Sequence, residues 1–174
     1  MTAPQYPKPQ YPSQAPGGFA AAPPLWAPYY GAPFKEAVQR VFKKYATFTG
    51  RASRAEYWWW ALVGAVVGVV LNIIISAGMV TSTSTYSGYA YSAPTLGPVS
   101  IIGVILAVVW GLAVVVPSLA LTVRRLHDVN MSGWMILLGL IPFVGGIIVL
   151  VFTLLPPKPE GQRFDQPTAP AYGH

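Results

Sequence analysis

Cysteine is absent from the 174 residues, and charged side chains are scarce at 9% of the chain. Without cysteine there can be no disulfide, thiol nucleophile or thiolate metal site. The two histidines, His127 and His174, are too far apart in sequence to form a multi-histidine metal site by themselves. Soluble domains carry about 25% charged residues, whereas 53% of this chain is hydrophobic and its mean hydropathy is +0.48. The composition indicates an integral membrane protein and predicts no cofactor and no metal.

Residues 1–33 are rich in proline and show no apolar periodicity. They contain nine of the eighteen prolines, and they lack the compact basic region and apolar core of a cleavable signal peptide. We expect a disordered, partly polyproline-II tail over residues 1–33. Two interpretations are open, a flexible spacer or a docking segment for a protein partner that recognises proline or modifies tyrosine.

Residues 34–49 have a helical period. Apolar side chains recur at steps of three and four from Phe34 to Phe48, and lysine, arginine, glutamate and glutamine occupy the other face. This pattern predicts an amphipathic interfacial helix that lies on an anionic membrane leaflet. A helix packed on the cytoplasmic end of the protein itself is equally compatible with the pattern.

Three apolar runs follow, at about 57–77, 99–121 and 134–155, and none contains Asp, Glu, Lys, Arg or His. About 20 residues are needed for a helix to cross a bilayer. The prediction is therefore an all-α integral membrane fold, a three-helix transmembrane bundle within a membrane domain at residues 50–165. Residues 166–174 would form a C-terminal tail.

The distribution of lysine and arginine predicts the orientation. Basic residues precede the first run and follow the second, whereas no charged residue lies between Met79 and Pro98. A cytoplasmic N-terminus in a multi-pass membrane protein satisfies this pattern. The third run is open to two interpretations, because Pro142, Gly145 and Gly146 could divide it into a hairpin and keep the C-terminus inside.

Small residues recur every four positions in the first two runs, as helix contacts in lipid require. They serve either packing within the chain or contact in a homo-oligomer. These residues are Gly64 and Gly68 in the first run and Gly103, Ala107 and Gly111 in the second.

Two clusters of charged residues adjoin the apolar runs, and the predicted topology places both clusters at the cytoplasmic face. Ser53 and Glu56 match a capping box that would begin the first helix. Two interpretations of these residues are open. They form either ion pairs that hold the helix ends together or a ring of arginines that binds lipid, because a guanidinium group can donate two hydrogen bonds to one phosphate. The predicted ring contains Arg51, Arg54, Glu56, Arg124, Arg125, His127 and Asp128.

Catalysis by His127 with Asp128 is the least favoured use of this ring, because no activated nucleophile accompanies them. No catalytic residue is therefore predicted. Nucleic-acid binding is not expected either, since the basic residues adjoin membrane spans instead of covering a soluble fold.

The order of short motifs between about Val38 and Asp165 resembles the bacterial domain-of-unknown-function 805 family of small YhaH-like inner-membrane proteins. The motifs are Gly50-Arg51-x-x-Arg54-x-Glu56-Tyr57-Trp58, Arg124-Arg125-Leu126-His127-Asp128, Ser132-Gly133-Trp134, Ile141-Pro142 and Gly161-Gln162-Arg163-Phe164. The chain departs from the family pattern at Gln162 and Asp165. The resemblance implies a multi-span helical protein of the bacterial inner membrane and implies no activity.

Together these observations predict a non-enzymatic membrane module that scaffolds or senses at the cytoplasmic face, with anionic lipids as partners of the charged ring. The alternative is a transporter or channel subunit that oligomerises through its glycines. Spans without titratable residues make coupled transport the less favoured of the two.

Overall fold

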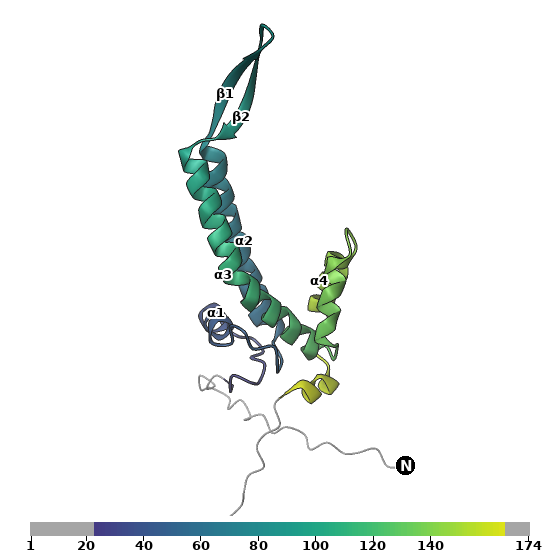
Figure 1. Cartoon of the computed structure of the whole chain (residues 1–174). Coiled ribbons are helices and arrows are strands. Elements are labelled where there is room, and N and C mark those ends of the chain that lie inside the picture. The colour runs from purple at the N-terminus through teal and green to yellow at the C-terminus, as the bar shows by residue number, and fades with distance from the viewer. Residues whose placement is uncertain (1–22, 166–174) are drawn as a thin grey trace, which may run out of the picture.

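The computed structural model describes residues 23–165, which form two long helices, a β-hairpin and several shorter helices. Figure 1 shows α2 and α3 side by side, with the β-hairpin extending from one end of the pair and α1 lying across the other. The elements in chain order are α1 (Phe34–Lys43), α2 (Arg54–Ala77), β1 (Met79–Tyr86), β2 (Tyr89–Leu96), α3 (Pro98–Asp128), η1 (Gly133–Leu140), α4 (Gly145–Leu154) and η2 (Pro159–Phe164).

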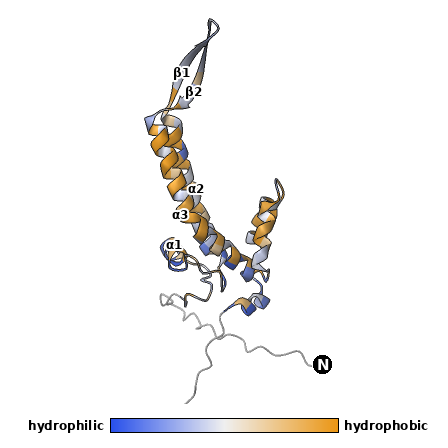
Figure 2. Ribbon diagram, viewed as in Figure 1, coloured by the Kyte–Doolittle hydropathy of each residue, from blue (hydrophilic) through white to orange (hydrophobic). Residues whose placement is uncertain are grey.

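Within residues 23–165, α2 and α3 are the two helices long and apolar enough to cross a membrane. Their apolar side chains are largely exposed, for example Ile73 at 60% and Leu112 at 70%, as contact with lipid requires. Figure 2 shows this apolar surface along the pair and hydrophilic residues at α1 and η2. α3 is 31 residues long, about 46 Å at 1.5 Å per residue, so its last turns can extend beyond the hydrocarbon layer.

The predicted capping box at the start of α2 is confirmed. The Glu56 amide donates to Ser53 Oγ at 3.2 Å, and the Ser53 amide donates to the Glu56 carboxylate at 2.8 Å. Two amides that the first turn leaves without helical partners are thereby satisfied.

The segment between α2 and α3, which carries no charge, forms a two-stranded antiparallel sheet, so the fold is mostly helical but not all-α as predicted. The register runs from Met79 opposite Leu96 to Tyr86 opposite Tyr89. Ser87 and Gly88 form the turn with φ of 52° and 80°, the positive values that tight hairpin turns favour. The tyrosines and threonines of this segment favour extended backbone.

The third apolar run is not one helix, which corrects the predicted three-helix bundle. η1 and α4 form a hairpin, and we call residues 133–155 the C-terminal arm. Pro142 cannot continue a helical hydrogen-bond ladder, and Phe143 has a φ of 66°. Gly145 permits the close turn, because a Cβ there would lie 1.8 Å from the Leu138 carbonyl oxygen. The chain therefore returns to the end from which it left, as the hairpin interpretation anticipated (Figure 1).

Only part of the small-residue pattern is used within the chain. A Cβ on Gly103 would lie 2.8 Å from Ile75 Cγ1 of α2, so this glycine permits α2 and α3 to approach. A Cβ on Gly64, Gly68 or Gly111 would meet no atom of the described chain within 4 Å. Ala107 is half-buried. The use of Gly64, Gly68 and Gly111 in a homo-oligomer stays a prediction.

Residues 23–33 have a defined structure against α1 and α2, so the disordered tail was predicted to extend too far along the chain. Trp59 Nε1 donates to the Ala32 carbonyl at 3.1 Å, and the Phe34 ring packs edge-on against Trp59 at 5.4 Å. Residues 1–22 and 166–174 lie outside the described residues. The amphipathic helix is also shorter than predicted, because α1 ends at Lys43.

Candidate functional site

The end of the α2/α3 pair that holds Arg54 and Asp128 is called here the charged end. α1, the start of α2, the last turn of α3 and η2 meet there (Figure 1). Seven of its ionic side chains are buried, whereas charged groups are rarely buried unless paired. These residues are named the buried ionic cluster: Arg40, Lys44, Arg51, Glu56, Arg124, Arg125 and Asp128.

Glu56 is the centre of one half of the cluster. Arg40 Nε donates to Glu56 Oε1 at 2.7 Å, and the Tyr29 amide donates to Glu56 Oε2 at 3.2 Å. The two remaining nitrogens of Arg40 donate to the carbonyls of Pro23, Pro24 and Ala27 at 2.8, 3.1 and 2.5 Å. One arginine of α1 therefore binds the proline-rich segment and the start of α2 together.

Asp128 is the centre of the other half. Its carboxylate pairs with Arg125 at 2.5 Å and Arg51 at 3.6 Å, and it accepts a hydrogen bond from the Tyr30 hydroxyl at 2.7 Å. Arg51 also makes a bidentate pair with Asp165, at 2.9 and 2.7 Å. Three parts of the chain that are far apart in sequence thus meet at the end of α3.

Arg125 connects this half to the C-terminal arm. Its Nε donates to the Thr153 carbonyl at 3.0 Å, and its Nη2 donates to the Leu155 carbonyl. The Lys158 amide donates to the Asp128 carbonyl at 2.9 Å. The arm is therefore held to α3 by one fully buried guanidinium, and the segment that follows the arm is held by the backbone hydrogen bond of Lys158.

His127 has a packing role in this geometry. Its ring stacks on Phe164 with centroids 4.1 Å apart and planes 5° apart, and its Nδ1 lies 3.1 Å from the Gly50 carbonyl. The neighbouring Asp128 faces arginines and Tyr30, so the structure does not orient these two side chains as an acid–base pair.

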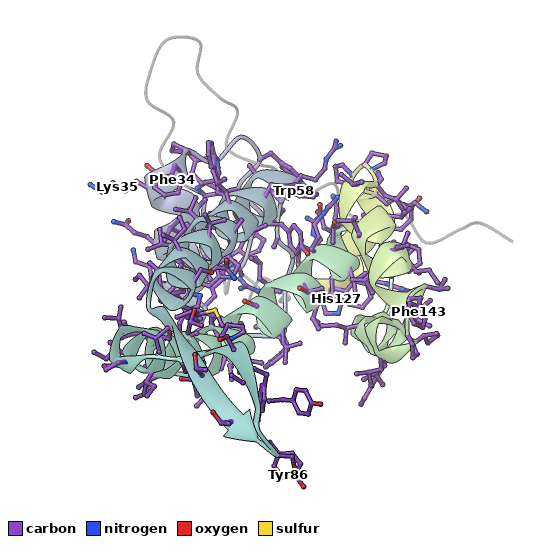
Figure 3. All side chains as sticks on the ribbon, turned by 90° about the horizontal axis from the view of Figure 1, so that it is seen from above. Phe34, Lys35, Trp58, Tyr86, His127 and Phe143 are labelled. Atoms are coloured by element: carbon purple, nitrogen blue, oxygen red, sulfur yellow. The ribbon has the colours of Figure 1, made fainter. Side chains whose placement is uncertain are left out.

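Arg54 lies outside the buried ionic cluster. It is exposed, and its Nη1 lies 3.4 Å from the Leu154 carbonyl. A cavity of about 940 Å³ opens beside it between α2 and α4, and Figure 3 shows Trp58 on the side of α2 that faces the C-terminal arm. We call this cavity the Arg54 groove, and its lining residues are Arg54, Ala55, Trp58, Trp59, Ala61, Leu62, Ala65 and Leu154.

Lys44 has an altered pKa. It is 4% exposed, and its pKa is lowered to about 8, mainly by burial. Glu56 and Asp165 oppose this lowering, whereas Arg124 and Arg40 add to it. Within residues 23–165 no group of three or more His, Cys, Asp or Glu could hold a metal ion.

Comparison with known proteins decides the family. The sequence pattern of the family described as "Protein of unknown function (DUF805)" matches residues 45–166. The chain belongs to this family. Inner membrane protein YhaI of Escherichia coli K12 is 36% identical over 113 residues, 64% of this chain and 77% of the relative. Inner membrane protein YhaH of the same strain is 34% identical over 125 residues, 72% of this chain and 89% of the relative. No solved structure matches the chain.

These relatives confirm the predicted family and the membrane assignment, and their names state no activity. The DUF805 region contains Arg51, Asp128 and Asp165, whereas Tyr30, Arg40 and Lys44 precede it. These three residues were not predicted to belong to the site. Tyr30 lies in a proline-rich segment, and Arg40 and Lys44 lie on a helix face that was expected to be exposed to solvent. A signal was present only at Arg40, which lies three residues after Ala37 and directly before Val41, and all three are buried in α1.

Proposed function

We propose that this DUF805 protein is a non-enzymatic, multi-pass membrane module that holds an anionic phospholipid at its cytoplasmic end. The observation that carries the proposal is the Arg54 groove. Its walls are indole rings and aliphatic side chains, and one exposed guanidinium lies at its charged end. An acyl chain suits the apolar walls, and a phosphate suits the guanidinium fork.

The charge pattern supports the choice of an anionic lipid. Among residues 23–165 Arg54 has no carboxylate partner, and Lys35 and Lys43 of α1 are exposed at the same end. Each basic residue near an anionic surface contributes about 1 kcal/mol to attraction. Figure 3 shows Lys35 extending away from the helix pair, as a headgroup contact would require.

The same pattern supports a cytoplasmic charged end. The exposed basic residues of the described chain lie there, whereas residues 79–96 of the β-hairpin carry no charge. Two spans and a returning C-terminal arm then keep both ends of the described chain on one side. The absence of an oriented acid–base pair at His127 and Asp128 in this geometry supports a binding role over catalysis.

Arg54→Ala is expected to lower the retention of anionic lipid about fivefold, the effect of losing about 1 kcal/mol. The measurement is the ratio of phosphatidylglycerol to phosphatidylethanolamine in polymer discs that contain the full chain. Lys158→Ala removes an equally exposed charge outside the groove and should leave the ratio near that of the wild type. Equal losses in both variants would show that lipid is retained by general attraction to the charged surface and not by the Arg54 groove.

The apolar part of the groove is tested separately. Ala65→Trp places an indole among the lining residues and should reduce retention as Arg54→Ala does. Val69→Trp, on an exposed part of α2 outside the lining, is the matched control and should not. Retention unchanged by Ala65→Trp would rule out an acyl chain in the groove.

A further inference from the structure

The buried ionic cluster contains more positive than negative charge. Five of its members are cationic, and only Glu56 and Asp128 are carboxylates. Asp165, with a side chain 11% exposed, pairs with Arg51 of the cluster and adds a third carboxylate. With Asp165 counted, the excess is two positive charges. A buried charge that lacks a counter-charge is strongly unfavourable, so a further anion would stabilise this end of the molecule.

The excess charge falls on two particular side chains. Glu56 pairs with Arg40, Asp128 with Arg125 and Asp165 with Arg51, each at 2.5 to 2.7 Å. Neither Lys44 Nζ nor Arg124 Nη2 has a hydrogen-bond partner among residues 23–165, and both atoms are fully buried.

Lys44 and Arg124 belong to one electrostatic neighbourhood. Lys44 follows the last residue of α1, and the Arg124 carbonyl accepts from the Ala52 amide at 3.0 Å, which ties α3 to the turn between α1 and α2. The charge of Arg124 lowers the pKa of Lys44, and Glu56 and Arg40 act on both side chains. The two unpartnered donors therefore belong to the same set of interacting charges at the charged end.

We propose that Lys44 and Arg124 together bind a phosphate-type oxyanion. An ammonium group offers three donors, and a guanidinium nitrogen offers donors in a fixed plane, so both can donate to oxygens of one tetrahedral anion. A dianion equals the excess of two charges that remains once Asp165 is counted with the cluster. The phosphate comes either from solution or from an anionic lipid headgroup. This site is separate from the Arg54 groove, so it does not depend on the proposed function.

The test measures the thermal unfolding midpoint of the full chain by tryptophan fluorescence in phosphatidylcholine discs. Inorganic phosphate is titrated against chloride at matched ionic strength, because a ligand that binds the folded state raises the midpoint. A parallel set of discs contains phosphatidylglycerol without free phosphate. A response to phosphate identifies the dissolved anion as the source. A response to phosphatidylglycerol alone that persists in Arg54→Ala identifies the headgroup, because the Arg54 groove is proposed to hold the same lipid. No response in either arm overturns the proposal.

Lys44→Met separates binding from a structural role. The variant should raise the midpoint without phosphate, since it removes a buried unpaired charge. It should also weaken the phosphate response at least about tenfold, as expected when one charged donor is lost.

Three control variants accompany Lys44→Met. Lys43→Met, at the exposed neighbouring position, should keep the full phosphate response, and Lys44→Arg should restore much of it. Arg54→Ala should also keep it, which distinguishes failure of this site from failure of the groove. An unchanged response in Lys44→Met contradicts the proposal.

Raising the pH gives an independent test. Lys44 is charged below its pKa of about 8 and is faced by Arg40 from α1, Glu56 from α2, Arg124 from α3 and Asp165 after η2. A bound anion raises that pKa, so the phosphate response should be lost at a pH above about 8. Phosphate itself gains negative charge over this range, so weakening must come from the protein. A response that persists at about pH 10 would exclude Lys44 as a donor.

Discussion

Glu56→Gln is expected to lower the free energy of unfolding by about 3 to 5 kcal/mol, the usual cost of removing one partner from a buried ion pair. Arg40 would keep its full charge in a buried position and lose its only carboxylate partner within residues 23–165. Lys44 and Arg124 would lose the same compensating charge, because Glu56 acts on both. A shift of one pKa unit corresponds to about 1.4 kcal/mol of interaction free energy.

The choice of glutamine isolates the charge from the helix cap. Glutamine at this position can still close a capping box with Ser53. Ser53→Ala removes the capping hydroxyl and keeps the carboxylate, with an expected loss of about 1 kcal/mol. A difference between the two variants therefore reports the ion pair.

Thermal unfolding and hydrogen exchange together check this prediction. Amides of residues 23–43 should exchange faster in Glu56→Gln, because Arg40 holds that segment through the carbonyls of Pro23, Pro24 and Ala27. Amides in the middle of α2 and α3 should exchange as in the wild type. Equal stability of the two variants would show that the Arg40–Glu56 pair contributes nothing beyond the cap.

Local patterns explain which parts of the fold were predictable. The Ser53–Glu56 cap depends on residues three positions apart, and the two spans depend on composition over about 20 residues. The pattern of Pro142, Gly145 and Gly146 fits a kink or a hairpin equally well. The decision between them rests on the contact of Arg125 with the arm and of Asp128 with Lys158 after it, which composition does not contain.

Long-range bonds explain the errors. Tyr30 and Asp128 are 98 residues apart in sequence, and their hydrogen bond helps to order a segment whose composition indicates a disordered tail. Lys44 was placed on a solvent face because the helical period was extended to residue 49, whereas the helix ends at Lys43. The ring residues Arg51, Glu56, Arg125 and Asp128 were found from sequence, but their burial and pairing required the structure.

Asp128→Asn is expected to loosen the C-terminal arm and to lower the unfolding midpoint by on the order of 10 °C, for a loss of about 3 kcal/mol. Arg125 would remain fully buried without its carboxylate partner, while Arg51 would keep its bidentate pair with Asp165. The change is measured by thermal unfolding and by hydrogen exchange of residues 133–164. Glu160→Gln, at an exposed position of η2, is the control and should leave both unchanged.

A double variant distinguishes charge imbalance from loss of a hydrogen-bond acceptor. Replacing Arg125 with methionine in the Asp128→Asn background removes the buried cation, so stability should recover in part. Recovery should be incomplete, because the bonds of Arg125 to the Thr153 and Leu155 carbonyls are lost as well. If the double variant is less stable than Asp128→Asn alone, those two carbonyl contacts outweigh the ion pair, and Arg125 acts mainly as the anchor of the C-terminal arm.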